Sequence, residues 1–438
     1  MRTLLAALAL AALPLPMLQP PPSFALAIRH ARLVHGDGRV TPRATVFVAS
    51  GRIARIDETR AADDVRAERE IAAAGRTLMP GLIDAHVHVE PWSLPLFLQH
   101  GVTSVRDVHN APAVILPLAA GDAPHRPRIV AAGAMLDGPG SFWPNAVIVD
   151  DVAGVREAVR QQVEAGAGVI KVYSRLTPSM VAAVVREARA RGVPVAAHLG
   201  RTNAVEAANA GVASIEHLSG IADAASRERD RLRRAHDDFL GGWTAFELEW
   251  LSLAPASLDD VARHLIARGV AVVPTLALHE AFSRLADPDL LRDPALGGVP
   301  ATTLKAWAPE DLMNRARWTA ATLEQFKRAL PILQRFVARY AALGGRVVAG
   351  TDTAQQFVVP GASLHRELEL YVAAGLTPAA ALRSATADAA DLLGIGERAG
   401  TIAIGKDADL VLVDGDPLAD IRATRRIAHV VRLGQVVR

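Results

Sequence analysis

The 438-residue sequence contains no cysteine, which excludes disulfide bonds, cysteine-ligated metal sites and thiol nucleophiles. An excess of one charge is also missing, because 48 basic residues face 46 acidic ones and the net charge is +2. We therefore expect no nucleic-acid or anionic-membrane partner. Aromatic residues make up only 4% and hydrophobic residues 50%, a balance typical of a globular protein. Lysine is scarce, with four among the 48 basic residues, so a lysine in an apolar strand needs a specific explanation.

The N-terminus has the pattern of a secretory signal. Arg2 precedes an apolar run over residues 4–13, and small residues follow a proline-rich stretch at Ser23 and Ala25. The apolar run is too short to span a bilayer, and no later segment is long and apolar enough to do so. We predict a cleaved signal peptide over residues 1–25, a periplasmic or secreted location, and no membrane span after cleavage.

The two ends of the mature chain differ from its middle. Residues 26–78 and 400–438 contain short β-branched strands broken by turns, and we expect them to form one small β-sandwich domain. Residues 79–399 alternate apolar strands with amphipathic helices, which predicts a (β/α)8 TIM barrel with its chemistry at the carboxyl ends of the strands. The alternative, an open doubly wound sheet, is disfavoured because no glycine-rich phosphate turn follows the first strand. The eight expected strands are 82–88, 102–107, 129–136, 169–173, 193–199, 214–218, 270–278 and 347–352.

Two connections are longer than barrel loops usually are. Residues 221–265 and 281–318 are charged and contain tryptophans, and we expect helical lid insertions over the barrel mouth. Thr377-Pro378 predicts the start of an ordinary packing helix that ends near Gly394.

Histidine, lysine and aspartate recur where the expected strands end. His86 and His88 are two residues apart in the first strand, so their side chains point to the same side. His198 and His217 end the fifth and sixth strands, and Asp352 ends the eighth. Each residue alone has a common structural explanation, but independent structural roles would rarely coincide at one face of a barrel.

Lys171 lies in the apolar fourth strand, where an unpaired ammonium would be costly to desolvate. In a chain rich in arginine, a lysine here indicates an amine that loses its proton, either as a nucleophile or as a carbamate. Six donors exceed one tetrahedral site and suit Zn²⁺ or a similar ion, which favours two metals and requires a bridging ligand.

These residues resemble the metal-dependent amidohydrolase superfamily, in its imidazolonepropionase-like and Xaa-Pro dipeptidase-like branch. The resemblance rests on residues 80–88 (PGLIDAHVH), on Lys171 and the later histidines, on residues 349–352 (AGTD) and on residues 400–410 (GTIAIGKDADL). It implies a barrel with a small β-sandwich and a binuclear site. By position, one metal would be held by His86, His88 and Asp352, the other by His198 and His217, with a CO2-derived carbamate on Lys171 as the bridge.

The expected reaction is hydrolysis of an amide bond by a metal-bridging hydroxide, with Asp352 as general base and then general acid. The substrate would be a small N-acyl amino acid, dipeptide or cyclic amide. The run His198-Leu199-Gly200-Arg201 lacks the second histidine of many relatives, and the loop 137–144 also departs from peptidase-like members, which weakens the case for a dipeptidase. Residues near the strand ends are candidates for substrate binding: Arg106, His109, Tyr173, Arg175, Arg201 and His279.

Three other functions stay open at this point. A mononuclear deaminase or imidazolonepropionase-like ring hydrolase would share the histidines without needing Lys171. A binuclear lactonase or phosphotriesterase-like hydrolase would use the same metals on an ester. A catalytically silent protein would bind metal without hydrolysis. The sequence leaves the substrate, the native metal and the homo-oligomeric state open.

Overall fold

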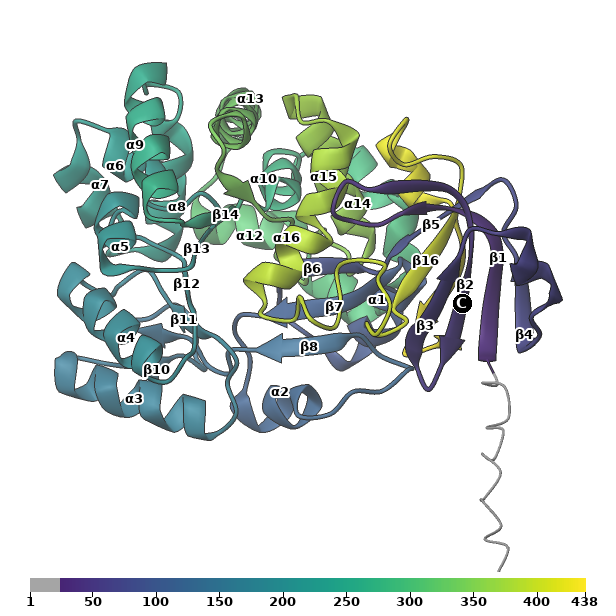
Figure 1. Cartoon of the computed structure of the whole chain (residues 1–438). Coiled ribbons are helices and arrows are strands. Elements are labelled where there is room, and N and C mark those ends of the chain that lie inside the picture. The colour runs from purple at the N-terminus through teal and green to yellow at the C-terminus, as the bar shows by residue number, and fades with distance from the viewer. Residues whose placement is uncertain (1–23) are drawn as a thin grey trace, which may run out of the picture.

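The computed structural model describes residues 24–438, which form a sheet built from both chain ends and a larger body of parallel strands surrounded by helices (Figure 1). The predicted signal peptide lies outside the described residues except for Phe24 and Ala25, which begin the first strand. Among residues 24–438, no helix is long and apolar enough to cross a membrane.

The sheet of the chain ends has the order β18-β17-β16-β5-β1-β2-β3, and β4 pairs with β1. The central pairing is between β5 and β16, whose residues lie more than 300 positions apart, so purple and yellow segments share one sheet in Figure 1. Apolar side chains from both ends, such as Leu26 and Leu412, pack in one cluster on this sheet. Its strands are β1 (Phe24–Val34), β2 (Val40–Ala49), β3 (Arg52–Asp57), β4 (Ala67–Ala72), β5 (Arg76–Pro80), β16 (Leu410–Asp414), β17 (Ile427–Arg432) and β18 (Gln435–Val436).

The parallel strands form two sheets, of order β6-β7-β8 and β10-β9-β11-β12-β13-β14-β15. Backbone hydrogen bonds also run between the two sheets. Ala85 N–H of β6 donates to the carbonyl oxygen of Ala349, which follows β15 (2.9 Å), and Gly168 N–H, which precedes β11, donates to Ala131 O of β8 (2.9 Å). The strands are β6 (Leu82–Val87), β7 (Val102–Asp107), β8 (Arg128–Ala131), β9 (Leu136–Asp137), β10 (Val147–Ile148), β11 (Ile170–Val172), β12 (Val195–Ala197), β13 (Ser214–Glu216), β14 (Ala271–Val273) and β15 (Arg346–Val347).

The observed strands begin close to the expected ones, but most end earlier. The expected strand 270–278 stops at Val273, because Thr275 takes a left-handed backbone (φ 51°) and helix α10 begins at Leu276. The expected strand 129–136 divides into β8 and β9, which belong to different sheets. The pattern of apolar residues predicts where the strands lie. It does not show where a residue other than glycine turns the chain and ends a strand.

Helices follow the parallel strands and cover their outer side (Figure 1). Thr377 caps α15 as the sequence predicts, but the expected single helix to Gly394 is divided at Thr386. The helices are α1 (Leu94–Gln99), α2 (Pro112–Ala119), α3 (Val152–Glu164), α4 (Pro178–Ala190), α5 (Ala204–Ala210), α6 (Ile221–Ala225), α7 (Arg229–Ala235), α8 (Phe239–Glu249), α9 (Pro255–Ala267), α10 (Leu276–Ser283), α11 (Ala301–Ala306), α12 (Pro309–Ala316), α13 (Ala320–Ala342), α14 (Ala362–Ala374), α15 (Pro378–Ser384) and α16 (Ala387–Leu392). Short 3-10 helices are η1 (Arg60–Asp64), η2 (Pro91–Ser93), η3 (Pro288–Arg292), η4 (Pro294–Gly298) and η5 (Ile421–Arg425).

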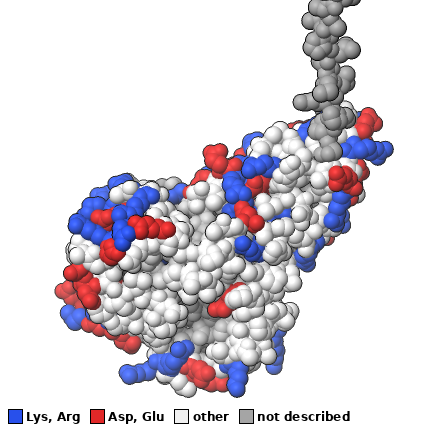
Figure 2. Space-filling view, turned by 90° about the horizontal axis from the view of Figure 1, so that it is seen from below, with Lys and Arg blue, Asp and Glu red and all other residues white. Residues whose placement is uncertain are grey.

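A buried group of charges, which we call the interface ion cluster, joins the sheet of the chain ends to the parallel strands. Arg128 of β8 contacts Asp407 (2.6 Å) and Asp409 (3.2 Å), and Arg432 of β17 contacts Asp409 (2.9 Å) and Asp122 (2.5 Å). Elsewhere on the surface, positive and negative side chains are interspersed on the face shown in Figure 2. Asp407, Asp409 and Arg432 of the C-terminal segment therefore have a structural role, because they hold the two parts together.

Candidate metal centre

A cavity of about 620 Å³ opens at the carboxyl ends of the parallel strands. Its floor includes His86 and Lys171, which lie within β6 and β11, and four residues that follow strands, namely His88, His198, His217 and Asp352. Side chains of α8, α10, α11 and α12 also line it, so both long connections contribute to its wall. The volume is that of a small-molecule site. The role of the two connections as lids stays a prediction.

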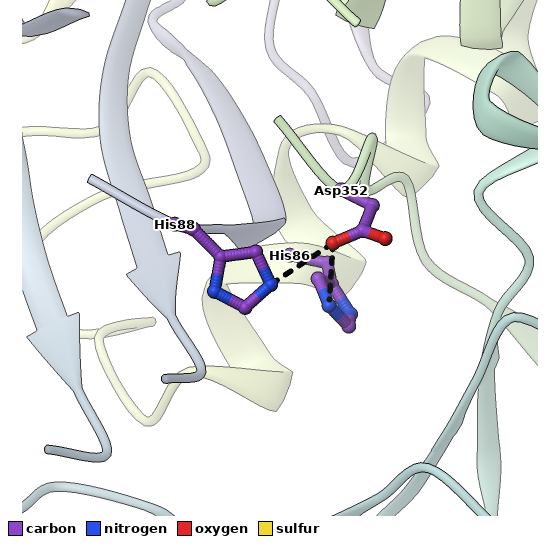
Figure 3. Close-up of side chains that lie close together, drawn as sticks. All are labelled: His86, His88 and Asp352. Atoms are coloured by element: carbon purple, nitrogen blue, oxygen red, sulfur yellow. Dashed lines mark ion pairs between the residues drawn. The ribbon is translucent and has the colours of Figure 1, made fainter. Parts of the chain in front are cut away.

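His86, His88 and Asp352 converge on one point of this floor (Figure 3). Asp352 Oδ1 lies 3.3 Å from His86 Nε2 and 3.0 Å from His88 Nε2. Each residue offers one ligand atom, and these atoms lie within 4.8 Å of one another. Two imidazoles and a carboxylate at this spacing are a donor set that Zn²⁺ and similar divalent ions accept.

The hydrogen bonds of the two imidazoles show why a cation fits between them. His86 Nδ1 lies 2.6 Å from the Glu216 carboxylate, and His88 Nδ1 lies 2.9 Å from the carbonyl oxygen of His109. Both acceptors assign the ring proton to Nδ1, so in the neutral rings both Nε2 atoms carry lone pairs directed at Asp352. Asp352 Oδ1 is buried and receives no hydrogen bond within the described residues. Three lone-pair donors around one point are stabilised by a positive charge among them.

The electrostatic environment agrees with this arrangement. Burial opposes ionisation of Asp352, but the imidazoles of His217 and His86 keep its pKa well below the usual value. Burial opposes protonation of His88, but the Asp352 carboxylate outweighs it and raises the His88 pKa. The site therefore favours an ionised carboxylate with positive charge beside it.

Glu216 and Arg106 support His86 from behind. The Arg106 guanidinium donates to both Glu216 oxygens (2.8 and 3.0 Å) and to Ala85 O (2.6 Å), and the Ser214 hydroxyl donates to Glu216 (2.5 Å). Burial would raise the pKa of Glu216, but Arg106 holds it below the usual value. A charged, fully paired carboxylate therefore fixes the tautomer and the direction of His86.

His198 and His217 lie beside the three converging residues. Their ring centroids are 4.8 Å apart, and the His217 ring lies 4.4 Å from the His86 ring. His217, directly after β13, has a left-handed backbone (φ 58°), as has Asp352 (φ 66°) in the segment after β15, and both side chains line the cavity. Burial lowers the pKa of both His198 and His217, so both rings are neutral, the form in which imidazole binds metals.

Lys171 is the central residue of β11 and is 1% exposed, yet it lines the cavity. Burial lowers the pKa of its amine to about 8, against the attraction of Glu216 and Asp352. The neutral amine is therefore accessible near physiological pH. This is the form that reacts with CO2 or with a carbonyl carbon.

Of the six residues expected to contact substrate, two line the cavity. His109 accepts the Met135 N–H at Nδ1 (3.1 Å), and burial lowers its pKa to about 3, so Nε2 carries the ring proton. The Tyr173 hydroxyl accepts the Trp143 Nε1–H (2.8 Å), which leaves its own proton free to donate. Both residues thus present a hydrogen-bond donor.

The other four expected contacts lie outside the cavity lining and have partners elsewhere. Arg106 is buried against Glu216. Arg175 and Arg201 both contact Asp237 in the segment before α8. His279 pairs through Nδ1 with Glu247, beneath the Trp243 ring. As substrate contacts these four positions stay predictions, since each side chain already has a protein partner within the described residues.

Two groups of residues near the cavity were not expected from the sequence. Glu216 supports His86 although 130 positions separate them, and the only local signal is its place next to His217 at a strand end. The second group is the aromatic lining, which comes partly from the long connections. The tryptophans in those connections were the signal in the sequence, but whether their side chains face the cavity depends on how the helices pack.

Comparison with known proteins decides the family. The Amidohydrolase family model matches residues 77–437. The chain belongs to the amidohydrolase family. This confirms the resemblance seen in the motifs.

Individual relatives agree with this assignment. Ochratoxinase from Aspergillus niger is 24% identical over 327 residues, which are 69% of this chain and 53% of that protein, so the chain spans about half the length of the relatives it matches in sequence. The structure of a bottromycin amidohydrolase is similar with a TM-score of 0.69 at 29% identity, covering 94% of this chain and 86% of the other. A Xaa-Pro dipeptidase with bound methionine gives a TM-score of 0.67 at 22% identity, covering 94% and 99%. These neighbours support a TIM-barrel-like α/β fold.

Proposed function

We propose that this amidohydrolase cleaves an amide bond in a small substrate, such as an N-acyl amino acid, a dipeptide or a cyclic amide, to give an acid and an amine. The observation that carries the proposal is the buried Oδ1 of Asp352, which receives no hydrogen bond within the described residues and faces two imidazole nitrogens at the floor of the cavity. The names of the relatives, ochratoxinase and Xaa-Pro dipeptidase among them, support hydrolysis of amides.

The proposed ligand set follows the side chains around the floor. One divalent ion would be held by His86, His88 and Asp352, and a second by His198 and His217. Lys171 would bridge them as a carbamate, formed when its neutral amine adds to CO2, with one N–C bond made and one proton released to solvent. Zn²⁺ suits these donors. Divalent ions at these positions supply Lewis acidity, which activates a water molecule and polarises the scissile carbonyl.

The chain's own residues would do the rest of the chemistry. Asp352 is ionised and lies at the centre of the floor, so it can accept the proton of the attacking water and return it to the leaving amine. The free proton of Tyr173 can be donated to the carbonyl oxygen as negative charge develops there. His109 can donate from Nε2 on the His88 side of the cavity, since the two rings lie 6.1 Å apart.

We also propose that the two parallel sheets form one closed eight-unit barrel. The hydrogen bonds that run between the two sheets support this, as does the isolated bridge between Val87 and Thr353. The β-sandwich assignment for the chain ends, the secretory leader and the periplasmic or secreted location stay predictions.

The test is the Asp352→Asn variant. We expect kcat/KM to fall by at least about 1000-fold, since proton transfer is lost, while metal content stays near that of the unmodified protein. Asp414→Asn, which changes an exposed carboxylate of the terminal sheet, is the matched control and should leave turnover unchanged. Substrates should include N-acyl amino acids, Xaa-Pro dipeptides, lactones and organophosphates. Activity retained by Asp352→Asn would remove its role, and hydrolysis confined to lactones or organophosphates would overturn amide cleavage.

A further inference from the structure

The cavity gathers aromatic side chains in a chain that has few. Only 19 residues of the 438 are aromatic, ten Phe, six Trp and three Tyr. Eight of these line the cavity: Trp92, Phe142, Trp143, Tyr173, Phe239, Trp243, Phe282 and Trp307. Aromatic surface that faces water is unfavourable, and it is stabilised when an apolar group covers it. The gathered rings therefore indicate a binding surface.

The aromatic surface begins directly beside the histidines. The Tyr173 ring centroid lies 4.4 Å and that of Phe239 5.9 Å from the His198 ring, and Trp243 lies 5.9 Å from the His217 ring. A substrate group that contacts these rings therefore lies directly beside the candidate ligands His198 and His217. It must be joined directly to the scissile amide rather than through a long spacer.

Charged side chains are placed differently. Among the described lining residues outside the six candidate ligands and His109, charge comes only from Glu90 and Arg315, and both are exposed. A carboxylate beside the scissile bond would take its partner from His109, Tyr173 or the exposed Arg315, whereas the part of the wall formed by Phe239 and Trp243 offers rings and no charge. That part of the cavity suits an apolar substituent.

The aromatic wall is fixed in place before any substrate arrives. Arg175 donates to Pro139 O (3.3 Å) in the loop that carries Phe142 and Trp143, and it also donates to Asp237 O, two residues before Phe239. The Phe142 and Phe239 rings then lie 4.8 Å apart, and Trp143 is hydrogen-bonded to Tyr173. Arg175 therefore positions two loops so that their rings form one surface, and less ordering is required on binding.

We propose that the substrate carries an aromatic ring on a group joined directly to the scissile amide, and that Phe239 and its neighbouring rings select it. This inference rests on the proposed function and narrows its substrate class. A flat ring can lie against Phe239 and Tyr173, which are themselves nearly parallel with centroids 5.7 Å apart.

The experiment compares kcat/KM for N-(2-naphthoyl)-L-alanine, N-acetyl-L-phenylalanine and N-acetyl-L-alanine. The first two place the ring on the acyl or the amine side, and the third has no ring. We expect at least one aromatic substrate to be preferred over N-acetyl-L-alanine by about 10-fold or more. Phe239→Leu should reduce that preference about 5-fold, because it keeps apolar volume and removes the ring. Phe326→Leu, a buried ring of α13 outside the cavity lining, is the matched control and should keep the preference.

Equal rates on all three substrates, or a preference that Phe239→Leu leaves intact, would overturn the inference while the proposed function stands. If none of the three is hydrolysed, the proposed function is decided by the wider substrate panel given above, and the inference is tested by binding alone. Quenching of tryptophan fluorescence by N-(2-naphthoyl)-L-alanine in the Asp352→Asn protein should then saturate, with about 5-fold weaker binding when Phe239→Leu is added. Absence of saturable quenching would overturn the inference as well.

Discussion

Two regions of this molecule bury several charges, and they differ in how completely those charges are paired. In the interface ion cluster, Asp409 meets Arg128 and Arg432, accepts the Leu433 N–H (2.8 Å), and is 5% exposed. Asp352 in the candidate metal centre is equally buried at 6%, but its Oδ1 has no hydrogen bond within the described residues and faces a cavity. Burial alone therefore does not distinguish a structural carboxylate from a functional one.

The comparison shows that ion-pair and hydrogen-bond partners, rather than burial, distinguish the structural carboxylate from the candidate metal ligand. A buried charge with full partners fixes the position of the segments that carry it, as the C-terminal segment is fixed here. A buried charge such as that of Asp352, whose neighbours are imidazoles and which faces a cavity, can be stabilised further by a cation that enters the cavity. Glu216 shows that both roles meet inside the site, because it is fully paired with Arg106 and yet directs His86.

The largest effect should come from breaking the fully paired region. Asp409→Asn would leave two buried guanidinium groups short of charge, and we expect the free energy of unfolding to fall by about 3–5 kcal/mol. Activity per folded molecule should stay within about 2-fold, because the cluster lies outside the cavity lining. Denaturant unfolding followed by circular dichroism measures the first quantity and steady-state kinetics the second.

The control in the same sheet is Asp414→Asn, whose partner Arg76 and own side chain are both exposed. Its loss should cost less than about 1 kcal/mol. If Asp409→Asn costs no more than Asp414→Asn, the pairing of the interface ion cluster is not what holds the two parts together.

A smaller effect should come from a hydroxyl that supports a candidate ligand. His217 Nδ1 lies 2.8 Å from Thr275 Oγ1, and Thr275 is fully buried. Thr275→Val keeps the shape and removes that hydrogen bond, so we expect metal affinity to fall about 10-fold with little change in the free energy of unfolding. Thr275→Ser restores the hydroxyl and should restore the affinity. Titration with Zn²⁺ against a competing chelator measures this, and equal affinities for the Val and Ser variants would show that the hydroxyl does not orient His217.

The sequence predicts the positions of most parallel strands because buried strands are recognisable as apolar β-branched runs. It does not predict where β13 and β14 end, because His217 and Thr275 turn the chain there with left-handed backbones that tertiary contacts hold in place. The same limit applies to long-range pairing. From the sequence, Arg106 is expected to face the cavity, but in the structure it pairs with Glu216, which is 110 positions away.

The candidate site shows a similar division. Its metal-ligating types were evident because histidine, lysine and aspartate at strand ends must meet at one face of a parallel sheet arrangement. Which arginines reach the cavity was not evident, since Arg175 and Arg201 depend on the path of the segment before α8. Long side chains on surface loops take partners that sequence spacing does not encode.

The most direct test of the central claim, that buried donors at the cavity floor hold divalent ions, is the metal content of the purified full chain by mass spectrometry. We predict two divalent ions per chain, with content and activity both lost after chelation and both regained when Zn²⁺ is added back. A protein that retains no divalent metal and hydrolyses amides equally well with and without chelator would contradict the account.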